Sequence, residues 1–192
     1  MAAIKDKRVR DSTIKKIETV MEKLGLDLGH EDFKETPERF LRMLEEMTEG
    51  QSDDLPFNFA TFQTTNNQLV TVGPVTVNSL CPHHLLPYFG HVYLGYVPSS
   101  LCVGLSKIPR LLKHRACFPQ KQEDFIESVA TEFEQLLKPR GLIVLMKAVH
   151  TCMRCRGALD STSTTTTTAI RGLRGHEIRD EFMQSILIPA IN

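Results

Sequence analysis

Residues 142–153 read LIVLMKAVHTCM, and this stretch joins a structural signal to a chemical one. The apolar run Leu142–Val149 predicts a buried β-strand. The strand ends at His150 and Cys152, so it delivers an imidazole and a thiol at one of its ends. Its longest apolar run is far too short to span a bilayer.

Three further segments predict strands. The threonine run Ser161–Thr168 is either low-complexity sequence or a strand, and its β-branched residues favour a strand that pairs with 142–149. Tyr88–Val97 is apolar on both faces, which predicts a strand covered on both sides. Leu69–Val77 is rich in valine, and Gly73-Pro74 inside it indicates a bulge or a sharp bend.

Helical periodicity marks the rest of the chain. The first expected helix carries Ile14–Leu24 and stops at Gly25, and the second is capped by Thr36, has Pro37 in its first turn and ends at Gly50. A short helix capped by Ser106 and a longer one over Phe125–Leu137 follow. The last expected helix covers Glu177–Ile188, with room for a short closing strand. The apolar face Phe40, Met43, Leu44 and Met47 of the second helix indicates core packing or a subunit contact.

The order of these elements predicts an α+β fold built on an antiparallel sheet. Residues 1–65 form an N-terminal helical region and an irregular connector, and residues 66–192 form the second domain. The formal net charge is zero, which argues against a nucleic-acid-binding protein held by bulk electrostatics. Five cysteines and no apolar signal segment at the N-terminus favour reduced thiols in the cytoplasm, with no membrane attachment.

The segment Cys81-Pro82-His83-His84 lies between two predicted strands. Cys81, His84 and Cys152 would give zinc three protein ligands and leave a fourth position for water, which is how catalytic zinc sites are built. His83 and His150 would then be available to carry protons. The spacing Cys152-x-x-Cys155 also fits a redox dithiol or half of a zinc ribbon, although no second cysteine pair and no thioredoxin-like context accompany it.

Basic residues near these motifs indicate what a metal would act on. Lys107 and Arg110 lie one turn apart at a helix start, and Arg154 and Arg156 follow Cys152. Such a cluster is either a solvated face or a phosphate clamp. Glu123, at the start of the long helix, is either a favourable first-turn charge or a carboxylate that accepts two adjacent N–H groups, as guanine presents on one edge.

An ordered set of motifs resembles the GTP cyclohydrolase I family. The resemblance runs from about Arg8 to about Ile186 and rests on Thr36-Pro-Glu-Arg-Phe40, Cys81-x-His-His84, Tyr96-Val-Pro98, Gly104-Leu-Ser-Lys-Ile-x-Arg110, Gln120-x-Gln-Glu123, His150-x-Cys-Met153 with Arg156-Gly157, and the threonine strand. No single motif is decisive, but the order of the whole set is highly specific.

The resemblance implies a tunnelling fold (T-fold) with N-terminal helices and a helical pair packed on the sheet, assembled as a decamer of two pentamers. It implies Zn²⁺ on Cys81, His84 and Cys152, and conversion of GTP to 7,8-dihydroneopterin triphosphate and formate. Glu123 would anchor guanine beside Gln122, and Lys107, Arg110 and Arg156 would receive the triphosphate near Ser106. His83 and His150 would carry protons. The downstream pathway is left open between folate, biopterin and deazapurine synthesis.

Two positions depart from the family pattern. Pro82 replaces the usual glutamate beside the first metal ligand, and Cys117-Phe118-Pro119 stands where the family favours an arginine. These departures keep two alternatives open: a T-fold homologue with an altered nucleotide substrate, and a catalytically weak nucleotide- and zinc-binding assembly protein. Retention of both His83 and His150 disfavours the second alternative, since a purely structural site needs neither.

Overall fold

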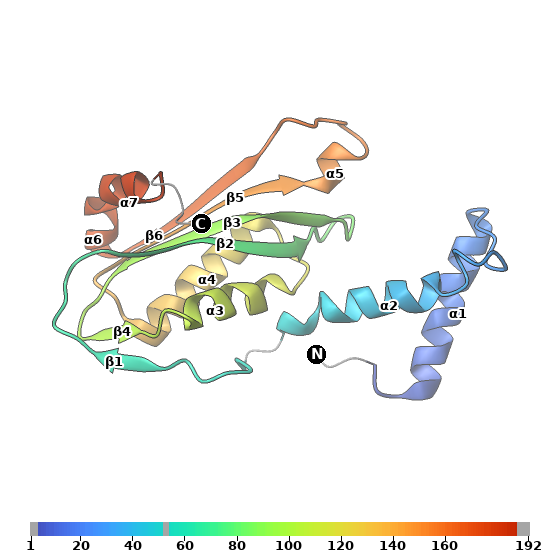
Figure 1. Ribbon diagram of the computed structural model, residues 1–192, viewed down its shortest axis with the longest axis horizontal. Coiled ribbons are helices and arrows are strands. Elements are labelled where there is room, and N and C mark those ends of the chain that lie inside the picture. Colours follow the sequence, from blue (N-terminus) through green and yellow to red (C-terminus); the bar gives the residue numbers. More distant parts are fainter. Residues whose placement is uncertain (1–3, 52–53, 188–192) are drawn as a thin grey trace.

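The structure is a computed structural model that describes residues 4–51 and 54–187 (Figure 1). Its main sheet has four antiparallel strands in the order β2-β3-β5-β6, and a small second sheet pairs β1 with β4. The strands are β1 (Thr61–Gln63), β2 (Val70–Leu80), β3 (Pro87–Val97), β4 (Leu101–Val103), β5 (Gly141–His150) and β6 (Thr165–Arg171). The helices are α1 (Lys7–Lys23), α2 (Thr36–Glu46), the 3-10 turn η1 (Glu49–Gln51), α3 (Lys107–Ala116), α4 (Gln122–Leu137), α5 (Thr151–Arg154), α6 (Gly172–Glu177) and α7 (Arg179–Ser185).

Strand β5 is the centre of the fold, as its sequence predicts. Alternate residues of a strand point to opposite faces of the sheet. Leu142, Val144 and Met146 therefore join the larger core under α3 and α4. Ile143 and Leu145 point the other way and pack in a smaller core with Phe182 of α7. Helices thus cover both faces of the central strand, which explains its nearly continuous apolar run.

Gly95 in β3 makes room for this second core. A Cβ atom built on Gly95 would lie 2.5 Å from the ring of Phe182, so a side chain there would push α7 off the sheet. The predicted two-sided cover of β3 is correct only for its C-terminal half. At the other end, Pro87, Phe89 and His91 are exposed, because α6 and α7 lie over the opposite end of the sheet (Figure 1).

The register of the sheet defines two ends that matter for function. Tyr88 pairs with His150 at one end, and Val97 pairs with Gly141 at the other. A strand of this length spans about 33 Å at ~3.3 Å per residue. Cys81 and His150 belong to the first end, whereas the chain leaves β3 at the second end to enter β4 and then α3.

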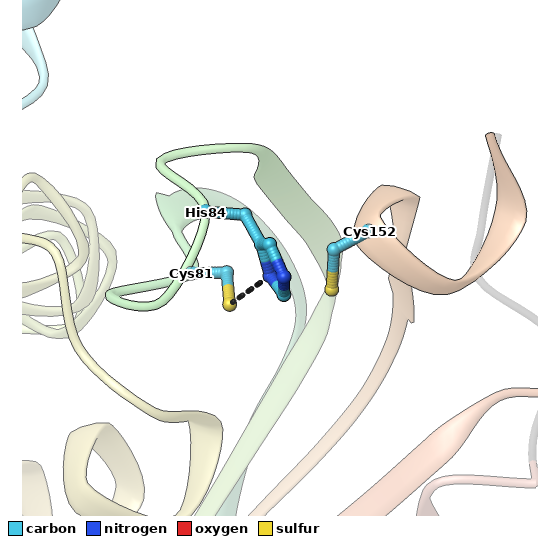
Figure 2. A group of neighbouring side chains, drawn as sticks. All are labelled: Cys81, His84 and Cys152. Atoms are coloured by element: carbon cyan, nitrogen blue, oxygen red, sulfur yellow. Dashed lines mark hydrogen bonds between the residues drawn. The ribbon is translucent and has the colours of Figure 1, made fainter. Parts of the chain in front are cut away.

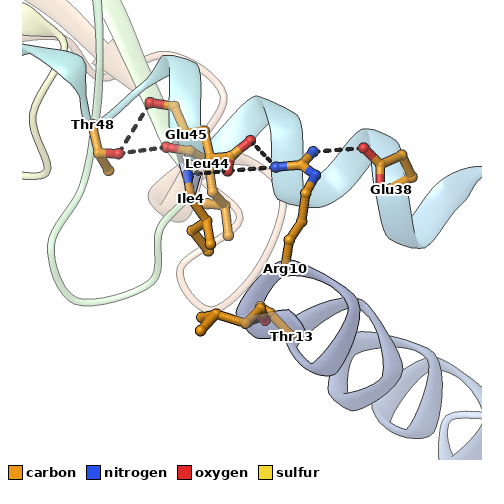
Figure 3. A network of polar contacts seen from close by, with 8 residues as sticks. Ile4, Arg10, Thr13, Glu38, Leu44, Glu45 and Thr48 are labelled. Carbon is orange, nitrogen blue, oxygen red and sulfur yellow. Dashed lines mark hydrogen bonds and ion pairs between the residues drawn. The ribbon is translucent and has the colours of Figure 1, made fainter. Parts of the chain in front are cut away.

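Helices α1 and α2 project away from the sheet and pack against each other (Figure 1). Arg10 of α1 connects them: its guanidinium donates to both Glu45 oxygens at 2.6 and 2.7 Å and to Glu38 at 2.5 Å (Figure 3). The Ile4 N–H also donates to Glu45. These bonds lower the pKa of Glu45, chiefly through the hydrogen bond from Arg10. The proposed domain division at residues 65 and 66 stays a prediction.

Several local expectations are wrong. Thr36 lies inside α2, whose N-cap is Glu35. Ser106 does occupy the N-cap position of α3, as expected, although its side chain makes no capping hydrogen bond. Helix α2 ends at Glu46, before Gly50. On α2 the buried residues are Pro37 and Leu41, while Phe40 is exposed, because α2 packs on α1 and lies beside the sheet domain.

The connector and the C-terminal part also contain elements that the sequence pattern missed. The expected irregular segment 51–65 contains β1, which pairs with β4. The expected threonine strand is confirmed but shifted, since β6 begins at Thr165 and continues to Arg171. The bulge in β2 is confirmed by a register shift between Val72 and Val75. The expected helix over Glu177–Ile188 is confirmed in a shorter form as α7, whereas α6 precedes it and is not predicted by the pattern. Ile188 and the suggested closing strand lie outside the described residues.

Candidate metal centre

The two chemical segments meet at the first end of the sheet. The loop between β2 and β3 is a tight turn in which Leu85 N–H donates to Cys81 C=O and Cys81 N–H donates to Leu86 C=O, each at 2.8 Å. This turn folds His84 back over Cys81. On the neighbouring strand, β5 ends at His150 and the single helical turn α5 brings Cys152 toward the same point. Two segments some seventy residues apart thus share one site.

Cys81, His84 and Cys152 form a Cys-His-Cys group whose ligand atoms all lie within 4.8 Å of one another (Figure 2). The Cys81 Sγ to His84 Nδ1 distance is 3.8 Å. Tetrahedral zinc with bonds of about 2.0–2.3 Å would separate its ligand atoms by about 3.5–3.8 Å. The donor set and its spacing therefore fit a three-ligand metal ion after only small side-chain movements.

The protonation of the thiols supports the same interpretation. Burial raises the pKa of the Cys152 thiol, and the nearby Cys81 raises it further. Two neighbouring thiolates would repel each other, so the pair is unfavourable as anions when nothing neutralises it. A divalent cation reverses this balance, because a coordinating thiol is deprotonated outright. The pair is thus well suited to hold a metal.

A cavity of about 200 Å³ opens beside this group. It is lined by Cys81, Pro82, His83, Tyr88, Gln120, Lys121, Gln122, Glu123, His150 and Cys152. Of the predicted site residues, the structure therefore brings Cys81, His83, Gln122, Glu123, His150 and Cys152 to one cavity. His83 Nδ1 lies 3.7 Å from Cys81 Sγ. Glu123 is exposed in the single chain and faces Lys121 at 3.5 Å.

His150 is held on two sides. Its ring stacks on that of Tyr88 with centroids 4.7 Å apart and planes 12° apart. Its Nε2 lies 2.8 Å from the side-chain oxygen of Gln122. Burial lowers the pKa of His150, and the charge of Glu123 partly opposes this shift. The neutral imidazole is therefore favoured near neutral pH, which is the form that can accept a proton.

Arg156 and Cys155 lie at the edge of the group. Arg156 Nη1 lies 2.8 Å from His84 Nε2, which places a guanidinium next to the Cys-His-Cys group. Cys155 is exposed, and its thiol donates to Thr151 C=O at 2.8 Å. It does not belong to the Cys-His-Cys group found among the described residues. This geometry favours metal ligation over a redox pair of Cys152 and Cys155.

Ser106, Lys107 and Arg110 do not line this cavity. They lie at or next to the start of α3, whose ten residues extend about 15 Å. The chain that follows α3 reaches the cavity, as the hydrogen bond from Gln120 N–H to Leu80 C=O shows. These three predicted substrate-binding residues therefore lie toward the other end of the helix. Lys107 instead approaches the ring of Phe57, with Nζ 5.9 Å from its centroid.

Tyr88 is the cavity residue that sequence reasoning missed most clearly. The apolar run of residues 88–97 predicts only that Tyr88 begins a strand, whereas the structure buries it completely against His150.

The burial of Gln122, by contrast, has a signal in the sequence. Gln122 shares the helical spacing of Phe125, Ile126 and Val129, so it lies on the apolar face of α4, whereas Glu123 lies on the exposed face.

Fold and site together define an α+β protein with a Cys-His-Cys group that could hold a metal ion beside a half-buried imidazole. Comparison with known proteins agrees with this class. Residues 13–187 match the family model described as GTP cyclohydrolase I, and the chain belongs to that family. The expected α+β tunnelling fold is thereby confirmed.

Named relatives support the same assignment. The chain is 37% identical over 174 residues to "GTP cyclohydrolase 1" of Campylobacter jejuni subsp. doylei, covering 88% of this chain and 92% of the relative. It is 39% identical to that of Aquifex aeolicus, covering 86% and 90%. It is also 37% identical to that of Saccharomyces cerevisiae, covering 87% and 70%. None of the helices in the described ranges has the length and apolar character that a bilayer span requires.

Proposed function

We propose that this chain is a zinc-dependent hydrolase that converts GTP to 7,8-dihydroneopterin triphosphate and formate. The observation that carries the proposal is the meeting of Cys81, His84 and Cys152 beside His150, in a chain that belongs to the GTP cyclohydrolase I family. The product class places the protein in pterin biosynthesis. All five cysteines are free thiols, which supports a reducing, cytoplasmic location.

The site residues divide into three roles. Cys81, His84 and Cys152 hold Zn²⁺, which acts as a Lewis acid and makes water a better nucleophile near neutral pH. His150 accepts a proton from the water that adds to C8 of the guanine ring, and His83 is a second proton carrier at the mouth of the cavity. Glu123 accepts hydrogen bonds from the ring N–H and from the exocyclic amino group of guanine.

A homo-oligomeric assembly is proposed because the cavity of a single chain is small and lacks the predicted substrate-binding residues of α3. The cavity of about 200 Å³ is smaller than the ~300–1,000 Å³ of typical ligand pockets, so it has room for only part of a nucleotide. Ser106, Lys107 and Arg110 lie away from it. A second copy that places its α3 start near this cavity would supply these phosphate ligands, alongside Arg156 of the first chain.

The sheet has the edges that such an assembly needs. Among the described residues, β2 and β6 each pair on one side only, so both edges of the main sheet are open. Pairing β6 of one copy with β2 of the next is a head-to-tail contact, and repeated contacts of this kind form a closed ring when the rotation between copies closes. This supports the pentameric rings of the proposed decamer.

The altered-substrate alternative has a smaller basis. Pro82 lines the cavity but is exposed. A glutamate at this position would therefore place its charge in solvent in the single chain. Phe118 contributes its backbone C=O, which accepts from Ser79 Oγ at 2.8 Å and from Gln120 Nε2 at 3.2 Å. Neither contact is specific for another base, and the relatives named above favour GTP as the substrate.

Substrate preference tests the proposal directly. Zinc-loaded protein should release formate and form a fluorescent pterin from GTP, at least ~10-fold faster than from ATP at equal concentration, because leaving Glu123 unpaired costs roughly 1–3 kcal/mol. Inosine triphosphate, which lacks the amino group, should fall between the two. The Glu123→Gln variant should weaken GTP binding and flatten this ranking. Equal turnover of GTP and ATP would show that Glu123 does not recognise the base, and no formate from any nucleotide would disprove the function.

The zinc content of two cysteine variants tests whether Cys152, and not Cys155, is a metal ligand. Cys155→Ser should retain close to one zinc per subunit and nearly full activity, because Cys155 is exposed and bonds only to Thr151. Cys152→Ser should lose most of its zinc at micromolar metal, since two remaining ligands do not make a stable site. Metal analysis of the purified variants measures both. Zinc loss from Cys155→Ser with retention in Cys152→Ser would reverse the assignment.

A further inference from the structure

Gln122 has an unusual environment for a residue first expected to contact substrate. It is only 1% exposed, although it occupies the first turn of α4. Its side-chain Nε2 lies 3.2 Å from Met146 C=O, 3.1 Å from Thr165 C=O and 3.0 Å from Thr167 Oγ1. Two of these three partners are carbonyl oxygens, which can only accept hydrogen bonds.

This environment fixes the orientation of the Gln122 amide. A flipped amide would place its oxygen against two carbonyl oxygens, and that arrangement forms no hydrogen bond with either. The amide oxygen must therefore face His150, whose Nε2 is 2.8 Å away. An amide oxygen only accepts, so Nε2 of His150 must carry the proton. In the neutral ring the other nitrogen, Nδ1, is then the unprotonated one.

Tyr88 fixes the plane of the same ring. It is fully buried, pairs with His150 across β3 and β5, and stacks on the imidazole at 4.7 Å. Its hydroxyl is buried next to Ser79, and the ring is the part of Tyr88 that contacts His150. Rotation of the imidazole would break both this stacking and the bond to Gln122.

We propose that Gln122 and Tyr88 are positioning residues that hold His150 in the Nε2–H tautomer, with Nδ1 as the proton-accepting atom. The inference rests on the proposed function and reassigns Gln122 from guanine contact to support of the proton carrier. His150 Nδ1 takes one proton from the water as its oxygen bonds to C8 and the C8=N7 electrons move to N7, while Nε2–H stays hydrogen-bonded to Gln122 Oε1. The imidazolium gives that proton to N7. When the C8–N9 bond then breaks, the proton of the C8 hydroxyl passes through the same Nδ1 to N9, which restores the neutral imidazole.

Kinetics distinguish positioning from substrate binding. Gln122→Met keeps the length of the side chain but removes the acceptor, and it should lower kcat by ~10²-fold, because a mispositioned base loses most of a general-base contribution. KM for GTP and the preference for GTP over inosine triphosphate should change less than about twofold. A rise in KM with loss of that preference would show that Gln122 reads guanine, and would overturn the proposal.

The Tyr88 variants provide a matched pair that leaves Gln122 intact. Tyr88→Leu removes the stacked ring and should lower kcat by ~10-fold or more, with zinc content unchanged. Tyr88→Phe keeps the stacked ring and removes only the hydroxyl, so it should recover most of that loss. Equal losses in both variants would show that the hydroxyl matters and the stacking does not, against the proposal.

The tautomer itself can be observed without turnover. In zinc-loaded protein labelled with ¹⁵N-histidine, solid-state NMR should show the neutral His150 ring protonated at Nε2, with the signal assigned by its absence in His150→Gln. In Gln122→Met the Nδ1–H form should appear. A native ring protonated at Nδ1 would refute the proposal even if GTP is turned over. The predicted tautomer in a protein that releases no formate would instead disprove the function and leave the positioning intact.

Discussion

The His150→Ala variant should keep its fold and its zinc but convert GTP ~10²–10⁴-fold more slowly than the unmodified protein, as expected for loss of a general acid–base group. The reason is geometric: His150 lines the cavity beside Cys81 and Cys152 but does not belong to the Cys-His-Cys group. Single-turnover formate release measures the chemical step, and metal analysis of the same sample measures zinc.

His91→Ala is the matched control for this substitution. His91 lies on the exposed face of the same end of β3, where its Nδ1 is 3.4 Å from Thr76 Oγ1, and it does not line the cavity. Its removal should change turnover by less than about twofold, as is usual for surface positions. Loss of zinc in His150→Ala would make His150 a ligand, and unchanged turnover would remove it from the mechanism.

Mixed assemblies should show the second large effect. Cys152→Ser subunits lack one of the proposed metal ligands, and Lys107→Ala/Arg110→Ala subunits lack the proposed phosphate ligands at the start of α3. Each variant alone should be nearly inactive. If one site uses residues of two neighbouring copies, random co-assembly should restore about a quarter of the sites, since each needs an intact group from both neighbours in a ring.

The control for co-assembly is a mixture of Cys152→Ser with Cys81→Ser. Both substitutions affect the same end of the same chain, so no combination of neighbours can rebuild the metal site. Differently tagged subunits, refolded together and purified through both tags, ensure that only mixed assemblies are assayed. Absence of recovery in the first mixture would mean that the start of α3 does not serve a neighbouring site.

Much of the fold is encoded in local patterns. The apolar runs of β3 and β5 and the β-branched run of β6 identified three strands of the sheet, because burial on a sheet face selects such residues directly. The helix starts were predicted less well. Thr36 and Ser106 are suitable capping residues, but the backbone leading into α2 and α3 is already turned, so neither side chain caps its helix.

The candidate site was also predicted only in part. The sequence suggested that Cys81, His84 and Cys152 share a metal, and the structure brings their ligand atoms together. The support of His150 could not be read from spacing, because Gln122 joins β5, β6 and α4 through partners that are 24 to 45 residues away in the chain. Such contacts depend on sheet register, which a single strand pattern does not specify.

The composition of β6 bears on how a single chain with an open sheet edge stays in solution. An unpaired strand edge invites aggregation, and natural edges are commonly protected by charged residues or proline. Over Thr165–Thr168 this edge carries only threonine, whose hydroxyl is polar while its β-branch favours an extended chain. Residues 165–168 of this edge therefore have neither a charge nor a large apolar side chain, and the charge of β6 lies at its last residue, Arg171. This stretch can stay exposed to water and still pair with a complementary strand. Valine at these positions would favour aggregation, whereas lysine would hinder strand pairing.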